Sequence, residues 1–216
     1  MNHSYTLGLV QVALLLLGLG LNTAAASAAT FNFSAHYDIT ATAQDLTPNL
    51  EKITLSGTSN DAQYGLNQVN SVSYSQTDFT TGAYSSNTDP VAFSLQGYQR
   101  GYVEFSGNGS DRLFATGSGT GAIDFTNLTV TTSTTLAITG GEGIFSGATG
   151  TLVSSQVVPA SIEIGVALKG QNTVSGTVET VPEPRFGMAP LVLGVIAARV
   201  LRRRKSTKKG CVAKRE

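Results

Sequence analysis

Cysteine, tryptophan and charged residues are all scarce in this chain of 216 residues. The single cysteine, Cys211, lies near the C-terminus, so the body of the protein cannot contain a disulfide and must be stabilised by packing and hydrogen bonding. Charged residues make up 13% of the chain, against roughly 25% in ordinary soluble domains. Polar character therefore comes from Ser, Thr, Asn and Gln, which is typical of β-rich extracellular proteins.

Histidine is also scarce, and His36 is the only one in the body. One histidine without a cysteine excludes a zinc site built from nitrogen and sulfur ligands, and it suggests no Ser-His-Asp or Cys-His set. The acidic residues lack the D-x-D-x-D-G spacing of a calcium loop, and no G-K-S/T completes a Walker loop. We therefore expect no metal, no cofactor and no catalytic residue, and hence no enzyme.

The formal net charge of zero conceals a strong asymmetry along the chain. Residues 30–184 contain four cations and thirteen acidic residues, a net charge of −9, whereas residues 185–216 contain ten cations and one acid, a net charge of +9. An acidic body argues against nucleic-acid binding, which requires a basic face. The split predicts two environments for the two parts of the chain.

The N-terminus has the layout of a secretory signal peptide. An apolar core runs from about Leu7 to Leu21, and small residues follow, with Ala26-Ser27-Ala28 as the A-x-A cleavage signal. Residues 1–28 are thus predicted to form a signal helix that signal peptidase removes. The alternative is an uncleaved membrane helix.

The C-terminal region contains a second apolar segment, followed by a basic block. The uninterrupted run, 186–198, would span about 20 Å as a helix, against roughly 30 Å for a bilayer core, and extending it to Leu201 brings it closer. We therefore predict a transmembrane helix over 186–201. By the positive-inside rule, the block Arg202, Arg203, Arg204 and Lys205 and the basic tail 206–216 stay in the cytoplasm, and the body lies outside.

These features together resemble a known sorting signal. Val181-Pro182-Glu183-Pro184, the apolar segment and the arginine cluster are similar to the PEP-CTERM signal of bacterial envelope proteins, over residues 181–205. The resemblance implies processing by an exosortase in the cytoplasmic membrane, and release of the body to the cell envelope or the extracellular space. Arg185, directly after the motif, and the tail beyond Lys205 depart from the family pattern.

The body, residues 29–180, shows the alternation of β-strands. Phe31, Phe33, Ala35, Tyr37, Ile39 and Ala41 share one face, which predicts a strand with one buried side. Further predicted strands cover residues 52–57, 69–76, 91–95, 102–106, 111–116, 122–130, 135–138, 151–158, 161–168 and 173–178. So many short strands favour an all-β fold, either a closed antiparallel barrel or a β-sandwich.

The glycine-rich segment 138–155 predicts a tight hairpin in which glycine supplies positive φ angles. Gly141-Glu142-Gly143 begins like a dinucleotide fingerprint, but the next glycine is one residue late and no helix is expected after it. The pattern Gly140, Gly141, Gly143, Phe145, Gly147, Ala148 and Gly150 resembles the hairpin of the allene oxide cyclase and dirigent barrels. That resemblance implies an eight-stranded, calycin-like antiparallel barrel.

The molecular activity is left open by these patterns. The leading hypothesis is an exported envelope protein with a structural, adhesive or matrix role, for which extracellular polysaccharide is a candidate partner. One alternative is a ligand-binding or cyclase-like barrel at the cell surface, and another is an uncleaved single-pass membrane protein. A polar cluster of His36, Arg100, Glu104 and Arg112 inside a barrel is also conceivable, although the alternation places His36 on the solvent face.

Overall fold

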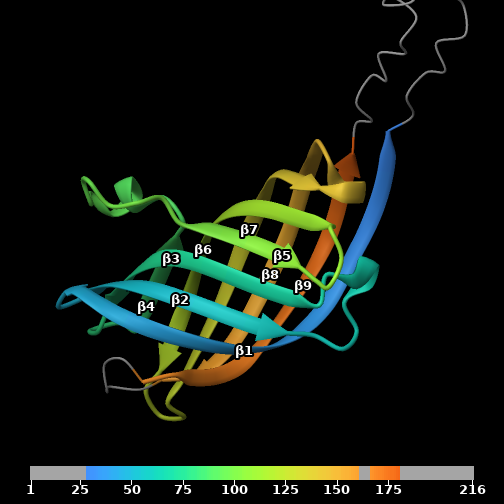
Figure 1. Cartoon of the computed structure of the whole chain (residues 1–216). Coiled ribbons are helices and arrows are strands. Elements are labelled where there is room, and N and C mark those ends of the chain that lie inside the picture. The colour runs from blue at the N-terminus through green and yellow to red at the C-terminus, as the bar shows by residue number, and fades with distance from the viewer. Residues whose placement is uncertain (1–27, 161–165, 181–216) are drawn as a thin grey trace, which may run out of the picture. The chain divides into compact units, whose positions relative to one another are not determined.

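The structure is a computed structural model that describes residues 28–160 and 166–180 (Figure 1). Those residues belong to one compact unit and form an all-β fold with a single antiparallel sheet of nine strands. The strands are β1 (Ala29–Thr47), β2 (Leu50–Thr58), β3 (Gln68–Asp78), β4 (Ala83–Asn87), β5 (Tyr102–Ser106), β6 (Arg112–Asp124), β7 (Thr129–Glu142), β8 (Ala148–Pro159) and β9 (Leu168–Thr180). Three short 3-10 helices lie in the connections: η1 (Gln63–Gly65), η2 (Pro90–Phe93) and η3 (Gly143–Phe145).

The predicted targeting segments lie outside the described residues. They are the signal helix, of which only Ala28 is described, the sorting signal 181–205 with its membrane helix 186–201, and the basic tail 206–216. Within the two described ranges, no helix is long and apolar enough to cross a bilayer.

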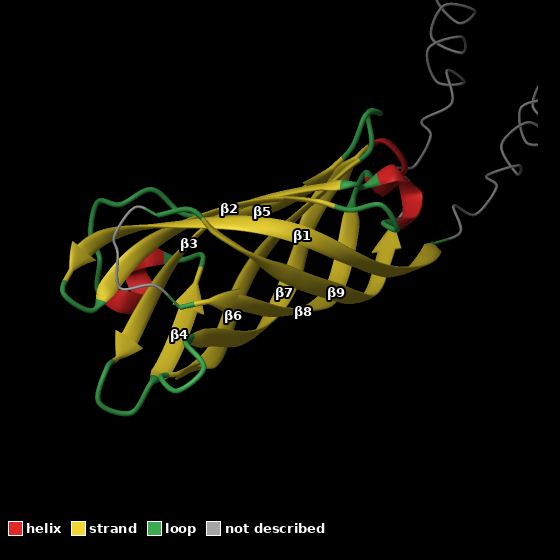
Figure 2. Ribbon diagram, turned by 90° about the horizontal axis from the view of Figure 1, so that it is seen from below, coloured by secondary structure: helices red, strands yellow, loops and turns green. Residues whose placement is uncertain are grey.

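The strand pairing closes the sheet on itself. The order β2-β1-β9-β8-β7-β6-β4-β3 is completed by pairing between β2 and β3, so eight strands form a ring, which we call the strand ring (Figures 1 and 2). All ten pairings are antiparallel. The predicted all-β class and antiparallel arrangement are confirmed.

One position of the strand ring is shared by two short strands. Both β4 and β5 lie between β3 and β6, and the segment between them, which we call the excursion (residues 88–101), leaves the ring and returns to it. Its ends are joined because the Gly101 N–H donates to the Thr88 carbonyl at 2.7 Å. A Cβ at Gly101 would lie 2.1 Å from the Val72 carbonyl oxygen, so this return point requires glycine.

Large apolar side chains fill one end of the strand ring, which we call the packed end. Phe33, Ala35, Tyr37 and Ile39 of β1 are each at most 2% exposed, in agreement with the predicted alternation. Buried side chains from β5 to β9 face them: Phe105, Leu113, Ile138, Leu152, Val174 and Val178. The Phe105 side chain lies at the centre, with its ring centroid 5.6 Å from that of Phe33 and 5.9 Å from that of Tyr37.

The strand predicted over residues 91–95 is wrong, because this segment forms η2 within the excursion. Pro90 begins the turn, and the Asp89 carboxylate accepts a hydrogen bond from the Val91 N–H at 3.0 Å. This bond gives the Val91 N–H a hydrogen-bond acceptor, which in a strand would come from a neighbouring strand. The strand in this region is instead β4, which the sequence does not predict.

The strand predicted over residues 122–130 is also wrong, because the turn between β6 and β7 interrupts it. The Asp124 carboxylate accepts hydrogen bonds from the N–H groups of Thr126 and Asn127, at 2.8 and 3.0 Å, and so fixes a local turn. Of the strand predicted over 161–168, residues 161–165 are not described, and β9 begins only at Leu168.

Candidate functional site

The interior of the strand ring is hollow at the end opposite the packed end. A cavity of about 350 Å³ opens there, beside the β1–β2 turn, the β3–β4 turn and the start of β9. Its wall is mainly aliphatic, with at least one such side chain from each of six strands, among them Ala43, Ile53, Ile123, Val130, Val158 and Leu168. We call this space the ring cavity.

Small inward-facing residues leave this space unfilled. Along β1, the inward positions change from Phe33 and Tyr37 at the packed end to Ala41 and Ala43 at the ring cavity. Along β6, Leu113 at the packed end is followed on the same face by Gly117, Gly119 and Gly121, which β7 approaches so closely that a Cβ would lie 2.1–2.7 Å from its atoms. Side chains this small do not meet across the ring, so the space between them remains open.

Short polar side chains separate the packed end from the ring cavity. They surround a smaller cavity of about 70 Å³, which is large enough for roughly two water molecules. Six of them come from five strands: Ser71, Ser73, Ser86, Thr134, Ser154 and Asn172. The Ser154 hydroxyl donates to Asn172 Oδ1 at 2.7 Å. Because Tyr84 and Gln156 line both spaces, this polar band forms the floor of the ring cavity.

Two carboxylates lie at the mouth of the ring cavity. Asp45 of β1 and Glu51 of β2 are cross-strand neighbours, and both line the cavity. Burial raises the pKa of Glu51 above its usual value, and the charge of Asp45 raises it further. Within the part of the chain that the structure describes, no cation lies within ion-pair distance of either carboxylate.

A half-buried tyrosine and a buried serine lie beside these carboxylates. Tyr84 lines the cavity, and burial raises the pKa of its hydroxyl. Ser75 is the cross-strand neighbour of Glu51 and is 1% exposed. The Ser75 hydroxyl lies near that of Tyr84 and offsets part of the rise in the Tyr84 pKa. The Ser75 hydroxyl nevertheless has no partner with hydrogen-bond geometry among the described residues. A buried hydroxyl without a partner is costly, so this site favours a further polar group.

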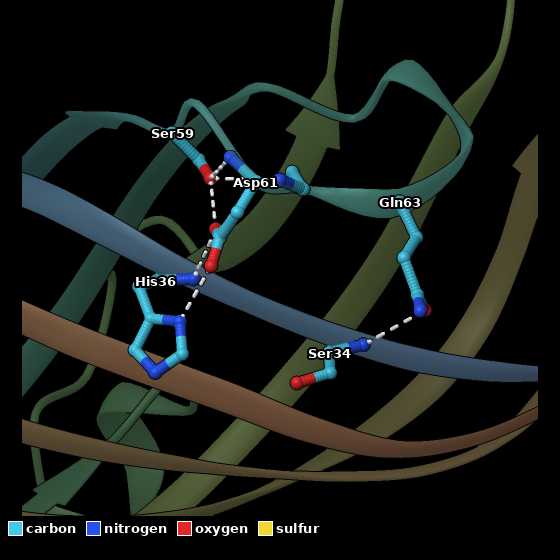
Figure 3. Close-up of polar contacts among 6 residues, drawn as sticks. Ser34, His36, Ser59, Asp61 and Gln63 are labelled. Carbon is cyan, nitrogen blue, oxygen red and sulfur yellow. Dashed lines mark hydrogen bonds and ion pairs between the residues drawn. The ribbon is translucent and has the colours of Figure 1, made fainter.

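The loop between β2 and β3, residues 59–67, covers the packed end of the strand ring. There β1 extends beyond β2, and three loop side chains bond to the backbone edge that β2 leaves free. The Ser34 N–H donates to Gln63 Oε1 at 3.2 Å, and the His36 N–H donates to Asp61 Oδ1 at 2.8 Å (Figure 3). The Tyr64 hydroxyl donates to the Asn32 carbonyl at 3.0 Å. Side chains thus take the place of a neighbouring strand.

Asp61 is the centre of this contact. Its second oxygen, Oδ2, lies 2.6 Å from Nδ1 of His36, and Oδ1 also accepts from the Ser59 hydroxyl at 2.8 Å (Figure 3). Hydrogen bonds from the His36 backbone, the His36 ring and Ser59 lower the pKa of Asp61 from 3.8 to about 2. His36 is on the solvent face, as the alternation predicts, with its side chain 69% exposed.

We predict that acid selectively weakens this loop contact. The pKa of Asp61 is lowered by folding, so the stability that its carboxylate contributes is complete above about pH 4 and is lost as the pH falls through about 2. Asp61→Asn should therefore be less stable than the wild-type protein at pH 5, and this difference should shrink towards pH 2. Thermal unfolding at successive pH values measures it. The control Asp38→Asn, on the outer face of β1, should show no shrinking difference, and parallel curves for Asp61→Asn would contradict the prediction.

The glycine-rich segment forms the connection from β7 through η3 to β8. Gly143 and Gly147 have φ angles of 65° and 68°, in the left-handed region that favours glycine. Phe145 is fully buried and packs against Phe31 and Tyr64, with ring centroids 5.3 and 5.9 Å away. The segment therefore lies at the packed end, away from the ring cavity.

The alternative polar cluster does not form. His36 contacts Asp61, and Arg100 lies 3.4 Å from Asp89 in the excursion. Only Arg112 and Glu104 come together, at 3.3 Å, and Arg112 also approaches Glu142 at 3.6 Å. None of the four residues lines the ring cavity.

Sequence reasoning did not identify Asp45, Glu51 or Tyr84 as site residues. A signal for the first two was present: Asp45 continues the odd-numbered face of β1, and the turn at residues 47–49 pairs it with Glu51. For Tyr84 the signal was weak, because β4 has polar residues on both faces. The sorting motif, Val181 to Pro184, and the basic block lie outside the described residues.

Comparison with family models, with curated proteins and with solved structures gives no significant match. The function must therefore be inferred from the geometry of the cavity and from the targeting segments of the sequence.

Proposed function

We propose that this chain is exported to the bacterial envelope and there binds a small, mainly apolar molecule in the ring cavity. The observation that carries this proposal is the cavity itself. Its volume of about 350 Å³ lies at the lower end of the range of about 300–1,000 Å³ that is usual for ligand pockets. Its largely aliphatic wall with a few polar groups is also usual for such sites.

The strand ring supports the interpretation of the fold as a calycin-like barrel that is packed at one end and open at the other. Eight antiparallel strands give an interior that their own side chains can fill, or that can hold one small ligand. In this chain, side chains fill the interior at the packed end, and the ring cavity leaves room for a small ligand at the other end. A sandwich of two separate sheets would not pair β2 with both β1 and β3 and also close through β9.

Export and sorting rest on the two ends of the sequence. The signal peptide 1–28 and the PEP-CTERM-like segment 181–205 would place the acidic body outside the cytoplasmic membrane and the basic tail inside it. Signal peptidase and an exosortase are the processing partners that this arrangement requires. An uncleaved single-pass protein is the competing outcome.

We infer a binding role for the ring cavity, whose wall is mainly aliphatic. The cavity favours ligand binding over a purely structural or adhesive role, because a scaffold needs no open interior.

Filling the ring cavity should abolish binding. Ala43→Trp projects an indole into the cavity, so the Kd of a neutral probe, 4-tert-butylbenzyl alcohol, should rise at least about tenfold from a value on the order of 1 mM. Chemical shifts of the Thr132 and Gln156 amides, in full-length chain held in lipid nanodiscs, measure the binding. The chain has no other tryptophan, so a blue-shifted emission verifies that the indole is buried.

The matched control is Gln44→Trp, which places the same indole on the outer face of the same strand. It should bind the probe as the wild-type protein does. The proposal is wrong if the wild-type protein shows no saturable shifts, or if both variants bind equally well.

A further inference from the structure

We propose that the ligand of the ring cavity is an organic cation, an apolar molecule whose ammonium group lies between Glu51 and Asp45. This inference rests on the proposed function and adds the chemical class of the ligand to it. The juxtaposition that carries it is a pair of carboxylates at the mouth of an aliphatic cavity, neither of which has an ion-pair partner among the described residues.

The two carboxylates are held together by the register of β1 and β2. Asp45 is exposed at the mouth, whereas Glu51 is half-buried. Because they are cross-strand neighbours, their negative charges repel one another, and opposed like charges destabilise a sheet. A cation between them would remove this repulsion and compensate for the partial burial of Glu51.

The buried hydroxyl of Ser75 adds a polar group beside Glu51, although Ser75 does not itself line the ring cavity. An ammonium group carries several donors, so one ligand could serve both carboxylates.

Aromatic side chains complete a suitable environment for a cation. Phe79, in the β3–β4 turn, and Tyr84, in β4, both line the same cavity. Aromatic faces attract organic cations, by up to several-fold in affinity at exposed sites and more where water is excluded. Among the described residues that line the cavity there is no Lys, Arg or His, so none of them competes with a cationic ligand or attracts an anionic one.

A metal ion does not suit this place. Calcium requires six to eight oxygen ligands, and magnesium a near-octahedral set. Two carboxylates beside an aliphatic wall fall well short of either number, and the described residues hold no cluster of three candidate ligands. A compact, hydrated ion would also leave the aliphatic wall uncovered, which an organic cation would cover.

Three probes of nearly equal size separate the possibilities. They are 4-tert-butylbenzylamine, which is a cation at pH 7, the neutral 4-tert-butylbenzyl alcohol, and the anion 4-tert-butylbenzoate. We expect the amine to bind the full-length chain about tenfold more tightly than the alcohol, and the benzoate to bind most weakly. The Thr132 and Gln156 amide shifts report each titration.

Two substitutions test the assigned residues. Glu51→Gln should reduce the preference for the amine over the alcohol by about fivefold or more, and Asp45→Asn should reduce it by less, because Asp45 is more exposed. The control Glu179→Gln removes one charge from the outer face of β9 and should leave the preference unchanged. Binding of the alcohol should be nearly equal in all four proteins, which shows that the cavity is intact.

The outcomes distinguish this inference from the proposed function. If the alcohol and the amine bind equally, or if Glu51→Gln retains the full preference, the ligand is not selected as a cation, but the cavity still binds apolar molecules. If none of the three probes binds, the proposed function fails and this inference fails with it.

Discussion

Phe105→Ala should lower the free energy of unfolding by about 3–5 kcal/mol. The Phe105 side chain is fully buried and contacts Phe33 and Tyr37 across the interior of the strand ring. Its removal would lose this burial and leave a space that the surrounding strands cannot close. Since a domain of this size is stable by about 5–15 kcal/mol, this loss would be a large fraction of the total.

Urea unfolding followed by far-ultraviolet circular dichroism measures this effect, because the chain has no tryptophan to report it. Phe125→Ala is the matched control. Phe125 lies in the β6–β7 turn and is 52% exposed, so its replacement should change the stability by no more than about 0.5 kcal/mol. Equal losses for the two variants would show that Phe105 does not lie at the centre of the packed end.

Deleting Val181 to Pro184 should nearly abolish the delivery of the processed body to the cell surface. In the proposed sorting signal these four residues are the motif that an exosortase reads, so the variant would no longer be recognised. The unprocessed chain should then stay in the cytoplasmic membrane.

Cell fractionation with mass spectrometry of the body measures this outcome. In the wild type, surface protein should lack the peptide that contains Cys211, whereas the deletion variant should retain it. A deletion of residues 206–209, in the basic tail, is the control of equal length and should leave delivery unchanged. Normal surface delivery without Val181 to Pro184 would mean that the segment is an ordinary anchor.

The alternation of apolar and polar residues predicted those strands whose inward residues are apolar. In β1, large apolar side chains alternate with polar ones from Phe31 to Ile39, so both the strand and its buried face could be predicted. The predicted strand 102–106 coincides with β5, whose inward residues Val103 and Phe105 belong to the core. Where a strand contributes to the packed end, its inward face is clearly more apolar than its outward face.

The same reasoning failed where the inward residues are small and polar. In β4, Tyr84 and Ser86 face the cavities and the outward residues are also polar, so the two faces look alike in the sequence. Serine on an inward face gives no contrast with serine on an outward one. The strands around the hollow part of the ring could therefore not be predicted from the alternation of apolar and polar residues.

The candidate site depended on register more than on residue type. Asp45 and Glu51 are ordinary strand-end acids until the pairing of β1 with β2 places them opposite one another and facing inward. A shift of one residue would have put Glu51 on the outer surface. Such a pairing can be expected from the short turn, but the volume that it borders follows only from all the strands together.

The excursion between β4 and β5 offers a place for protein engineering. Its first and last residues, Thr88 and Gly101, are hydrogen-bonded to one another, and Thr88 is tied to Gly117 through both its backbone N–H, at 2.9 Å, and its hydroxyl. A second anchor lies before Gly101: the Tyr74 hydroxyl donates to the Gln99 carbonyl at 2.6 Å, and the Tyr74 ring packs against Tyr98. A foreign epitope could therefore be grafted in place of residues 91–97, and if the chain is exported as proposed, the epitope would be displayed on a projection that these anchors already hold in position.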